Sequence, residues 1–378
     1  MKILFVSHYS GLNGAPRSMV ELINELKRVS IEAYVILPQR GKLESVLRKN
    51  KIKYYIVPFK PCAYSLEKEV CLQDRLRNEI YNLKAIQQIA KLINELKIDI
   101  VHSNSFAVNV GASAAFLMRR PHIWHFREFM DKDFNIRNNL EKKDVWLARR
   151  SCAIIANSDA IKRYYKNKFG LKNIVRIYNG IPVDKYYISR ENFFTHDKLQ
   201  FLIAGSFSPN KGQENAIMAC KYLVDNGYTE FELNIVGEGY KEYVASLKRL
   251  VQKNHLEPYI KFLGAQTDMV SVRQNMDVEL VCSVCEAFGR VTIEAMAGGL
   301  LVIGANTGGT KEIIQHQSNG LLYEQSDVKA LFEAMKAVYE CKEQYIEIIR
   351  EGAIEVSSKY DTKIMSEKIR MLYSKIVK

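Results

Sequence analysis

Apolar and polar residues alternate along the first half of the chain with two different periods. Short apolar runs rich in β-branched and aromatic residues predict strands at 2–7, 33–37, 54–57, 100–102, 122–126 and 153–157. The stretches between them have helical periodicity: residues 16–29 place Met19, Leu22 and Leu26 on one face, and residues 80–96 follow the same rule. Strands that alternate with helices predict βαβ units, a parallel sheet and right-handed crossovers.

The same pattern restarts in the second half. Further strands are predicted at 200–204, 232–236, 260–263, 278–281, 301–305 and 321–323. Residues 178–184 between the two series are rich in turn formers. We therefore predict an α/β protein of two doubly wound Rossmann-like domains, over 1–178 and 179–360, with a last helix in 361–378 that crosses back to the first domain. Because α/β sheets bind ligands at the carboxyl ends of their strands, we expect a ligand cleft between the two domains.

The charge of the chain is distributed unevenly. The 378 residues include 55 Lys and Arg against 42 Asp and Glu, a net charge of +13, and 47% are hydrophobic, which is ordinary for a globular protein. Residues 1–180 hold 32 basic and 16 acidic side chains, whereas the remainder holds 23 and 26. The basic half fits an anionic partner such as a membrane surface, a nucleic acid or a phosphorylated ligand. A generally Lys-rich proteome is the alternative explanation.

Several classes of protein are excluded by missing signals. The sequence contains neither GxxxxGK[ST] nor a GxGxxG after the first strand, so a P-loop NTPase and the usual dinucleotide site are disfavoured. No run of about 20 apolar residues and no signal-peptide core is present, so we expect neither a membrane-spanning segment nor a secretory signal peptide. Seven cysteines form no regular framework, which predicts reduced thiols in a cytosolic setting. Cys282 and Cys285 have CxxC spacing but lie in an apolar run without a second pair, so we expect buried thiols and not a zinc or redox site.

The clearest chemical signal is the pair of carboxylates Glu286 and Glu294 around a predicted helix start at Gly289. The amides of residues 288–291 would then point outward from a helix N-terminus, which carries about half a positive charge. Such an end binds a pyrophosphate, and a carboxylate beside it can accept hydrogen bonds from vicinal sugar hydroxyls. Two surface glutamates around an ordinary helix cap are the alternative.

Two glycine-containing turns follow predicted strands. Residues 204–214 run from a strand through a Gly-Ser-Pro turn into a helix opened by Lys211, which can be a counter-charge for a phosphate. In the loop after the first strand, Gly11 and Gly14 let the backbone approach a ligand closely, and Pro16 suits the start of a helix.

Two further strand ends carry candidate groups. His125, Arg127 and Glu128 lie where a strand of the basic half ends, and an imidazole there can serve chemistry or contact sugar hydroxyls. A structural histidine is the alternative. Residues 305–312 combine a strand end, a glycine turn and a helix start, and offer more backbone amides at the same cleft.

Together and in this order, these motifs resemble the retaining glycosyltransferases of the GT-B fold, specifically family four, over nearly the whole chain. The resemblance implies that Glu294 binds the ribose hydroxyls of a nucleotide diphosphate sugar, Glu286 holds the donor sugar, and Lys211 neutralises the diphosphate. The donor site that it implies also includes Gly14, Ser206, Phe288, Gly289, Arg290 and Val291.

The resemblance also implies roles for the first domain. His125 would face the transferred sugar or the acceptor, as a catalytic residue beside Glu286 and Lys211, and Arg127 and Glu128 would lie on the acceptor side. The sequence departs from the family in two turns. Ser206 stands where the family commonly has Arg, so that Arg290 or Arg17 would have to replace it, and Asn13 precedes Gly14 where two glycines are common.

We therefore expect a retaining hexosyltransferase that needs no metal or cofactor. The donor would be an NDP-sugar, with a UDP-sugar favoured, and the acceptor a glycan or a lipid-diphosphate-linked molecule of cell-surface polysaccharide or glycolipid synthesis. Its place would be the cytoplasm, peripheral to an anionic membrane through the basic domain, with no nucleic-acid partner. A sugar-nucleotide epimerase or hydrolase on the same scaffold, or a non-catalytic nucleotide-sugar sensor, are the alternatives.

Overall fold

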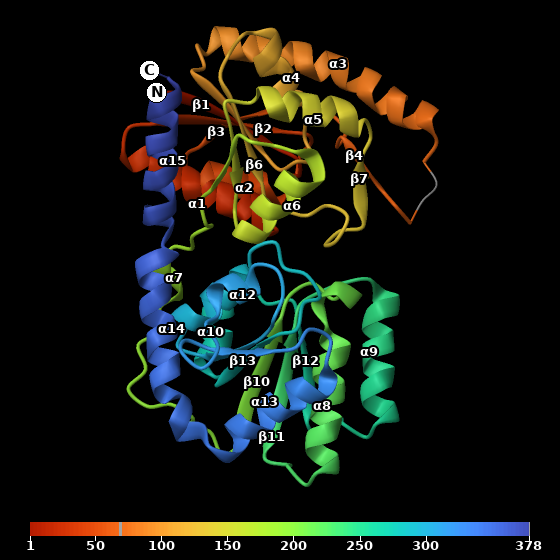
Figure 1. The fold of residues 1–378 in the computed structure, drawn as a ribbon, viewed down its shortest axis with the longest axis vertical. Helices are drawn as coiled ribbons and strands as arrows, with labels where there is room; N and C mark the ends of the chain where they lie inside the picture. Colours follow the sequence, from red (N-terminus) through yellow and green to blue (C-terminus); the bar gives the residue numbers. More distant parts are fainter. Residues whose placement is uncertain (68–69, 378) are drawn as a thin grey trace. The chain divides into compact units, whose positions relative to one another are not determined.

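The chain divides into two α/β units in the computed structural model, which describes residues 1–67 and 70–377 (Figure 1). Unit 1 comprises Met1–Gly180 and Thr362–Lys378, and unit 2 comprises Ile181–Asp361. The chain therefore leaves unit 1 inside the turn-rich stretch singled out in the sequence, and its last helix belongs to unit 1.

Unit 1 is built on a parallel sheet of seven strands in the order β3-β2-β1-β5-β6-β8-β9. Its strands are β1 (Lys2–Ser7), β2 (Glu32–Leu37), β3 (Lys53–Ile56), β5 (Ile100–Asn104), β6 (His122–Phe126), β8 (Ala153–Ala156) and β9 (Ile174–Arg176). Its helices are α1 (Gly14–Arg28), α2 (Lys42–Lys49), α3 (Leu72–Glu95), α4 (Val110–Leu117), α5 (Glu141–Arg150), α6 (Asp159–Phe169) and α15 (Thr362–Ile376). An antiparallel pair, β4 (Ala63–Ser65) with β7 (Ile136–Asn138), lies outside the main sheet.

The period-two pattern of the strands divides the core of unit 1 into two layers. Ile3 and Phe5 of β1 face α1, α2 and α15, whereas Leu4 and Val6 face α3 and α4. All four side chains are fully buried. A strand covered on both faces needs apolar residues at every position, which explains the continuous apolar runs in the sequence.

The short strands β4, β7 and β9 were not predicted from the sequence. The helix predicted over 80–96 was too short, because α3 begins at Leu72. Each of these strands has three residues, too few to show a period. The first turns of α3 expose apolar residues, so their pattern did not point to a core-facing helix.

Unit 2 repeats the architecture with a parallel sheet of six strands in the order β12-β11-β10-β13-β14-β15. Its strands are β10 (Leu199–Ala204), β11 (Phe231–Val236), β12 (Ile260–Gly264), β13 (Val278–Val281), β14 (Leu301–Ala305) and β15 (Leu321–Tyr323). Its helices are α7 (Val183–Tyr186), η1 (Pro209–Lys211), α8 (Gln213–Asp225), α9 (Lys241–Lys253), α10 (Met269–Gln274), α11 (Arg290–Ala297), α12 (Thr310–Ile313), α13 (Val328–Glu340), η2 (Lys342–Tyr345) and α14 (Ile346–Lys359). The predicted α/β class with two doubly wound sheets is confirmed.

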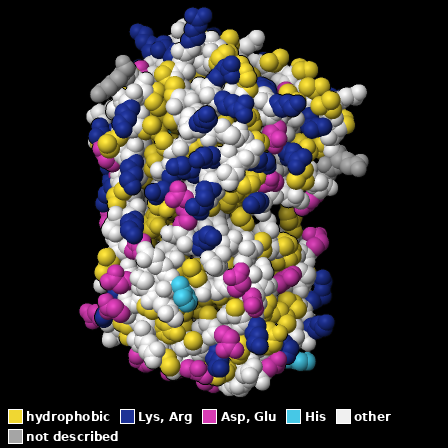
Figure 2. All heavy atoms as spheres, in the orientation of Figure 1, with side chains coloured by type: hydrophobic (Ala, Val, Ile, Leu, Met, Phe, Trp, Pro, Cys, Tyr) yellow, Lys and Arg dark blue, Asp and Glu magenta, His cyan; other side chains and the backbone are white. Residues whose placement is uncertain are grey.

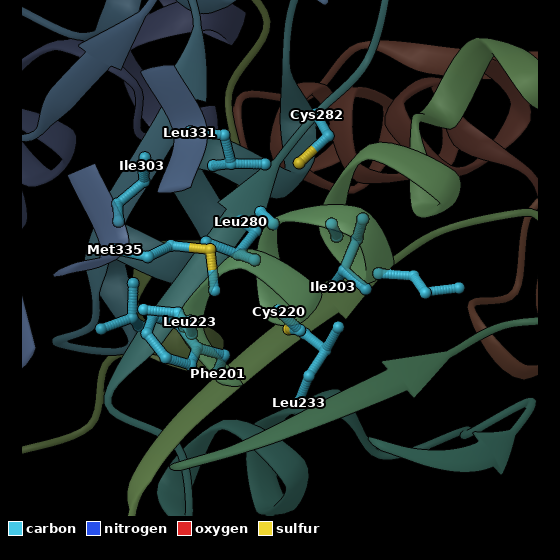
Figure 3. Close-up of a cluster of buried hydrophobic side chains, with 14 of the residues drawn as sticks. Phe201, Ile203, Cys220, Leu223, Leu233, Leu280, Cys282, Ile303, Leu331 and Met335 are labelled. Carbon is cyan, nitrogen blue, oxygen red and sulfur yellow. The ribbon is translucent and has the colours of Figure 1, made fainter. Parts of the chain in front are cut away.

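The core of unit 2 packs α8, α9 and α13 on one face of this sheet. Figure 3 shows part of it, with Leu280 and Ile303 of the sheet facing Met335 of α13. Cys220 and Cys282 are buried in this core (Figure 3). All seven cysteines are free thiols.

Candidate active site

The loops after β10 and β13 meet at one end of the unit 2 sheet, because these strands are parallel neighbours. The amide of Val284 donates to the carbonyl of Asn210 at 2.9 Å. Gly212, with φ +69°, fits so closely against Cys282 that a Cβ atom would overlap its carbonyl oxygen. Only glycine combines this left-handed backbone with so close an approach. The two loops are thereby held in contact.

This contact brings together two of the predicted catalytic residues. Lys211, the last residue of η1, forms an ion pair through Nζ with Oε1 of Glu286, and Ser283 Oγ donates to the same oxygen at 2.7 Å. The side chains of Lys211 and Glu286 are 29% and 15% exposed, so both reach solvent. Ser283 was not predicted as a site residue, because a lone serine after a strand carries no recognisable pattern.

Helix α11 begins where the sequence predicts it, with Gly289 as its N-cap at φ +103° and Arg290 as its first residue. The glycine turn within residues 305–312 holds the preceding loop in place. The amide of Gly309 donates to the carbonyl of Glu286 at 2.7 Å, and a Cβ atom on Gly308 would overlap that oxygen. The N-terminus of α11 and the Lys211–Glu286 pair therefore belong to one rigid loop cluster, which the separate sequence motifs could not establish.

Glu294, in the second turn of α11, is only 4% exposed and lies between two arginines. Its Oε1 accepts from Arg290 Nε at 2.7 Å and its Oε2 from Arg273 Nη1 at 3.2 Å. Arg273, from α10, is itself 1% exposed and also binds Glu279 of β13, at 2.7 Å. The sequence analysis missed Arg273, since nothing in the pattern of α10 marks it as buried.

The remaining predicted donor residues lie around the two loops and at the start of α1. Phe288 is buried, with its ring 5.9 Å from that of Tyr360, and Val291 is half-buried in the first turn of α11. Ser206 is exposed. In unit 1, Gly14 opens α1, and a Cβ atom there would meet nothing within 4 Å.

His125 lies fully buried in β6 of unit 1, and its hydrogen bonding fixes its tautomer. Nδ1 is 3.2 Å from Arg127 Nη2. Because a guanidinium only donates, Nδ1 must accept and the proton must lie on Nε2. Within the described residues, Nε2 has no hydrogen-bond partner. Burial lowers the pKa of His125 well below 6.5, and the charge of Arg127 lowers it further, so the imidazole is neutral.

A second histidine supports this ring. The ring of His102 in β5 lies 5.4 Å from that of His125, and its Nδ1 is 2.7 Å from the hydroxyl of Tyr373 in α15. Tyr373 follows His102 by 271 positions, so sequence analysis had no means of pairing them.

Arg127 and Glu128 are both buried, and both carry internal hydrogen bonds. Arg127 donates through Nε to Asn104 at 2.6 Å and through Nη1 to Asn179 at 2.7 Å. Glu128 accepts from the hydroxyl of Ser105 and from the amide of Phe106, and its burial raises its pKa to about 6. Glu128 thereby holds the loop after β5, and Arg127 joins the end of β5 to Asn179. Their predicted place on the acceptor side stays a prediction.

The described part of the chain has neither a membrane-spanning helix nor a cluster of metal ligands. Residues 1–67 and 70–377 contain no helix long and apolar enough to cross a membrane. They also contain no group of three or more His, Cys, Asp or Glu placed to hold a metal ion.

Two family models match the sequence of this chain. The model described as Glycosyltransferase Family 4 matches residues 12–185, and the model described as Glycosyl transferases group 1 matches residues 184–354. The chain belongs to glycosyltransferase family 4. The resemblance inferred from the motifs is confirmed, and the protein is a glycosyltransferase.

Curated relatives of this glycosyltransferase cover most of its length. An uncharacterized glycosyltransferase of Haemophilus influenzae is 24% identical over 327 residues, which are 85% of this chain and 88% of the relative. The UDP-Gal:alpha-D-GlcNAc-diphosphoundecaprenol alpha-1,3-galactosyltransferase of Escherichia coli is 23% identical over 367 residues, 89% of this chain and 90% of the relative.

Solved structures match the fold of the glycosyltransferase over its whole length. The crystal structure of Anabaena HepE in complex with UDP has a TM-score of 0.85 at 24% identity, and the match covers 99% of this chain and 100% of that chain. At this level of identity the likeness establishes the GT-B fold.

Proposed function

We propose that this glycosyltransferase moves a hexose from a UDP-sugar to a glycan or lipid-diphosphate-linked acceptor in cell-surface polysaccharide or glycolipid synthesis, with retention of the anomeric configuration. The observation that carries the proposal is the cluster in unit 2 of Lys211, Glu286 and the N-terminus of α11. It combines a cation, a carboxylate and the N-terminus of a helix, which are the groups that suit a sugar diphosphate.

The preference for UDP rests on the relatives. The HepE structures hold UDP or UDP-glucose, and the Escherichia coli relative is named for transfer from UDP-Gal to a diphosphoundecaprenol-linked sugar. A lipid-diphosphate acceptor would also suit the positive charge of unit 1, which includes 37 Lys and Arg against 17 Asp and Glu. With such an acceptor and seven free thiols, we place the enzyme in the cytoplasm at the inner face of the membrane.

In the proposed reaction, the bond between the anomeric carbon and the diphosphate breaks, and the acceptor hydroxyl attacks from the same side and gives its proton to the departing diphosphate. Lys211 and the α11 amides stabilise the negative charge that develops on the leaving diphosphate, so the reaction needs no metal. Lys211 would exchange its partner Glu286 for the diphosphate, which frees Glu286 for the donor sugar. Glu294, held by two arginines, would accept from the ribose hydroxyls, and the neutral His125 would donate from Nε2 to the transferred sugar or to the acceptor.

Thermal unfolding with a panel of NDP-sugars tests donor binding. We expect a UDP-sugar to raise the unfolding temperature of the wild type and to raise that of Glu294→Gln much less, because the amide replaces one carboxylate acceptor. Glu347→Gln, exposed on α14, is the matched control and should respond like the wild type. If no sugar nucleotide stabilises the wild type, the donor assignment is wrong.

Transfer assays then separate the enzyme from its alternatives. Product should form only when acceptor is present, should keep the anomeric configuration of the donor, and should persist with a metal chelator. Turnover of donor in acceptor-free buffer would favour an epimerase or hydrolase, and donor binding without transfer to any acceptor would favour a sensor.

A further inference from the structure

Helices α3, α4 and α5 form one layer of unit 1 whose outer face contains none of the proposed donor or acceptor residues (Figure 1). Helix α4 packs against both α3 and α5. Lys143 of α5 also forms an ion pair with Glu79 of α3 at 2.6 Å. The three helices therefore present a continuous surface, which we call the α3–α5 face.

Helix α3 has two apolar sides where an ordinary helix on a sheet has one. Its buried side packs on the sheet through residues such as Ile86, Ile89 and Ile93. A second stripe is exposed to solvent: Leu72 at 54%, Leu76 at 41%, Ile80 at 66% and Leu83 at 55%. At about 100° per residue these four side chains fall within roughly a quarter of the helix circumference. A contiguous exposed apolar stripe of this kind marks an interaction surface.

Aromatic side chains extend the apolar surface onto the neighbouring helices. Phe116 of α4 is 54% exposed and its ring lies 5.0 Å from that of Trp146 of α5, which is 40% exposed. The guanidinium of Arg150 lies 3.7 Å above the Trp146 ring. An exposed tryptophan beside a cation is typical of groups that lie at a membrane interface, where the ring enters the apolar region and the charge stays with the headgroups.

Basic side chains border the stripe on one side. Arg77, Lys84 and Lys91 follow each other at intervals of seven residues, so they lie on one edge of α3. Arg77 and Lys91 have ion partners within their helix, Asp74 and Glu95, in exposed pairs that contribute little and can be exchanged. Further exposed basic residues lie on or next to α4 and α5: Arg119, Arg120, Lys142, Arg149 and Arg150. Figure 2 shows hydrophobic and basic side chains side by side over the region of α3.

We propose that the α3–α5 face docks unit 1 on an anionic phospholipid bilayer, with Leu72, Leu76, Ile80 and Leu83 entering the interface and the flanking lysines and arginines contacting lipid phosphates. Apolar residues on one strip with basic residues beside it are the combination that binds amphipathic helices to such membranes. A second copy of the chain fits less well, because two units of net charge +20 would repel each other. A nucleic acid would leave the aliphatic stripe without an apolar partner.

Vesicle sedimentation with the full-length protein tests the proposal without donor or acceptor, so its outcome is independent of the proposed reaction. We expect binding to vesicles of phosphatidylcholine with phosphatidylglycerol, little binding to phosphatidylcholine alone, and a decrease with salt because exposed charges are screened. Trp146 supplies a second readout, since the other tryptophan, Trp124, is buried. Its fluorescence should shift to shorter wavelength on binding, and Trp146→Phe should abolish the shift while binding persists.

Two sets of variants separate the apolar and the basic parts of the face. Leu76→Ser/Ile80→Ser/Leu83→Ser should weaken binding by more than about tenfold. Its control is Ile354→Ser/Met371→Ser, which changes exposed apolar residues of α14 and α15. Arg77→Gln/Lys84→Gln/Lys91→Gln should weaken binding by about tenfold or more and reduce its salt dependence. Its control is Lys241→Gln/Lys248→Gln/Lys253→Gln, an equal change of charge on exposed positions of α9.

Because every substituted side chain is exposed, circular dichroism should show unchanged folding. Equal binding by the stripe variant and the wild type would overturn the proposal. The proposal would also be overturned if the wild type were a dimer, the stripe variant were a monomer, and both bound vesicles equally, because the stripe would then be a contact between two copies of the chain.

Discussion

The two units share one architecture but bury their polar groups in different ways. Unit 1, with a strongly basic sequence, buries His102, His122 and His125 with lowered pKa values, so the imidazoles are neutral. Unit 2, which holds 18 Lys and Arg against 25 Asp and Glu, buries Arg273 between the carboxylates of Glu279 and Glu294. The buried arginine of unit 1, Arg127, instead donates to the neutral amides of Asn104 and Asn179. Burying a charge is costly unless it is paired, whereas a neutral imidazole needs only hydrogen bonds.

The difference matters because both kinds of burial lie beside candidate functional groups. In unit 2, Arg273 holds Glu294, the carboxylate proposed to bind the ribose. The buried ion pairs therefore position a charged side chain that is proposed to contact the ligand. In unit 1, His102 lies against His125, whose proposed role requires a neutral donor. The candidate carboxylate of unit 2 is therefore held by buried ion pairs, whereas the candidate imidazole of unit 1 lies beside a second neutral imidazole and the buried Arg127.

The strongest test of this contrast is Arg273→Met, which leaves two buried carboxylates without their shared cation. We expect the free energy of unfolding of unit 2 to fall by about 3–5 kcal/mol. Urea unfolding, with hydrogen exchange followed at the amides of β13, measures the loss in unit 2 itself. Arg249→Met, on the exposed side of α9, is the control and should stay within about 0.5 kcal/mol of the wild type. A loss below about 1 kcal/mol for Arg273→Met would mean that Glu279 and Glu294 need no buried cation.

Lys211→Ala should have the opposite profile, with a large loss of activity and a small loss of stability. The Lys211–Glu286 pair reaches solvent, so it contributes little to folding, whereas its proposed contact with the leaving diphosphate predicts a fall in kcat/KM of about 10²–10³. Transfer assays and thermal unfolding measure the two effects. The control is Lys221→Ala: Lys221 has a similar exposure, 33%, and pairs with Asp225 on α8, so its loss should leave transfer unchanged. Equal activity of the two variants would remove Lys211 from the reaction.

The neutral histidines predict a pH dependence that belongs to unit 1. His122 lies between the hydroxyls of Ser103 and Ser151, at 2.9 and 2.7 Å, and burial lowers its pKa from 6.5 to about 3. Below pH 6.5 the unfolded chain binds a proton at His122 that the folded chain does not bind. The contribution of this neutral imidazole to the free energy of unfolding is therefore complete above pH 6.5 and is lost as the pH falls. This histidine alone should cost about 2 kcal/mol at pH 5.

His122→Gln should therefore flatten the decrease in unfolding free energy between pH 6.5 and 5, whatever its stability at neutral pH. Urea unfolding at several pH values measures the slope. His255→Gln, at an exposed position of unit 2, should keep the wild-type slope. An unchanged slope for His122→Gln would show that this imidazole takes up its proton in the folded protein.

The smallest effect is expected from Tyr373→Phe, which removes the partner of His102 Nδ1. Because the Nε2 of His102 already lacks a partner within residues 1–67 and 70–377, the variant leaves both ring nitrogens unsatisfied in the core. We expect a loss of about 1–2 kcal/mol in thermal unfolding. Tyr240→Phe, at an 83% exposed side chain, should be neutral. Equal stability of both variants would mean that the hydroxyl of Tyr373 contributes nothing to the packing of α15 against the rest of unit 1.

Much of the fold was predictable because the apolar periodicity is local. The long strands of both sheets are covered on both faces, so runs such as 2–7 and 301–305 consist almost entirely of apolar residues and are recognisable. The start of α11 at Gly289 and Arg290 was also predictable, because a helix cap is determined within a few residues. Strands β4, β7 and β9 were missed because three residues show no period and each of these strands includes a polar residue, whereas the three residues of β15 are Leu, Leu and Tyr and were recognised.

The candidate site was predictable only as separate motifs. Glu286, Lys211 and Glu294 could be named, yet their partners Ser283 and Arg273 carry no sequence signal. The exposed stripe on α3 was missed for a related reason. Apolar residues at helical spacing predict a buried side, and the sequence of α3 does not say which of its two apolar sides lies against the sheet.

By itself, the sequence determined the two parallel α/β sheets, the likeness to family four and the positions of the charged and glycine-rich turns, because periodicity, caps and turns depend on neighbouring residues. The tertiary structure decided which distant groups meet: Lys211 with Glu286, Arg273 with Glu294, and His102 with Tyr373. These contacts depend on how strands and helices pack, and the free energy of burying a charge or an imidazole is set by that packing and not by the order of residues along the chain.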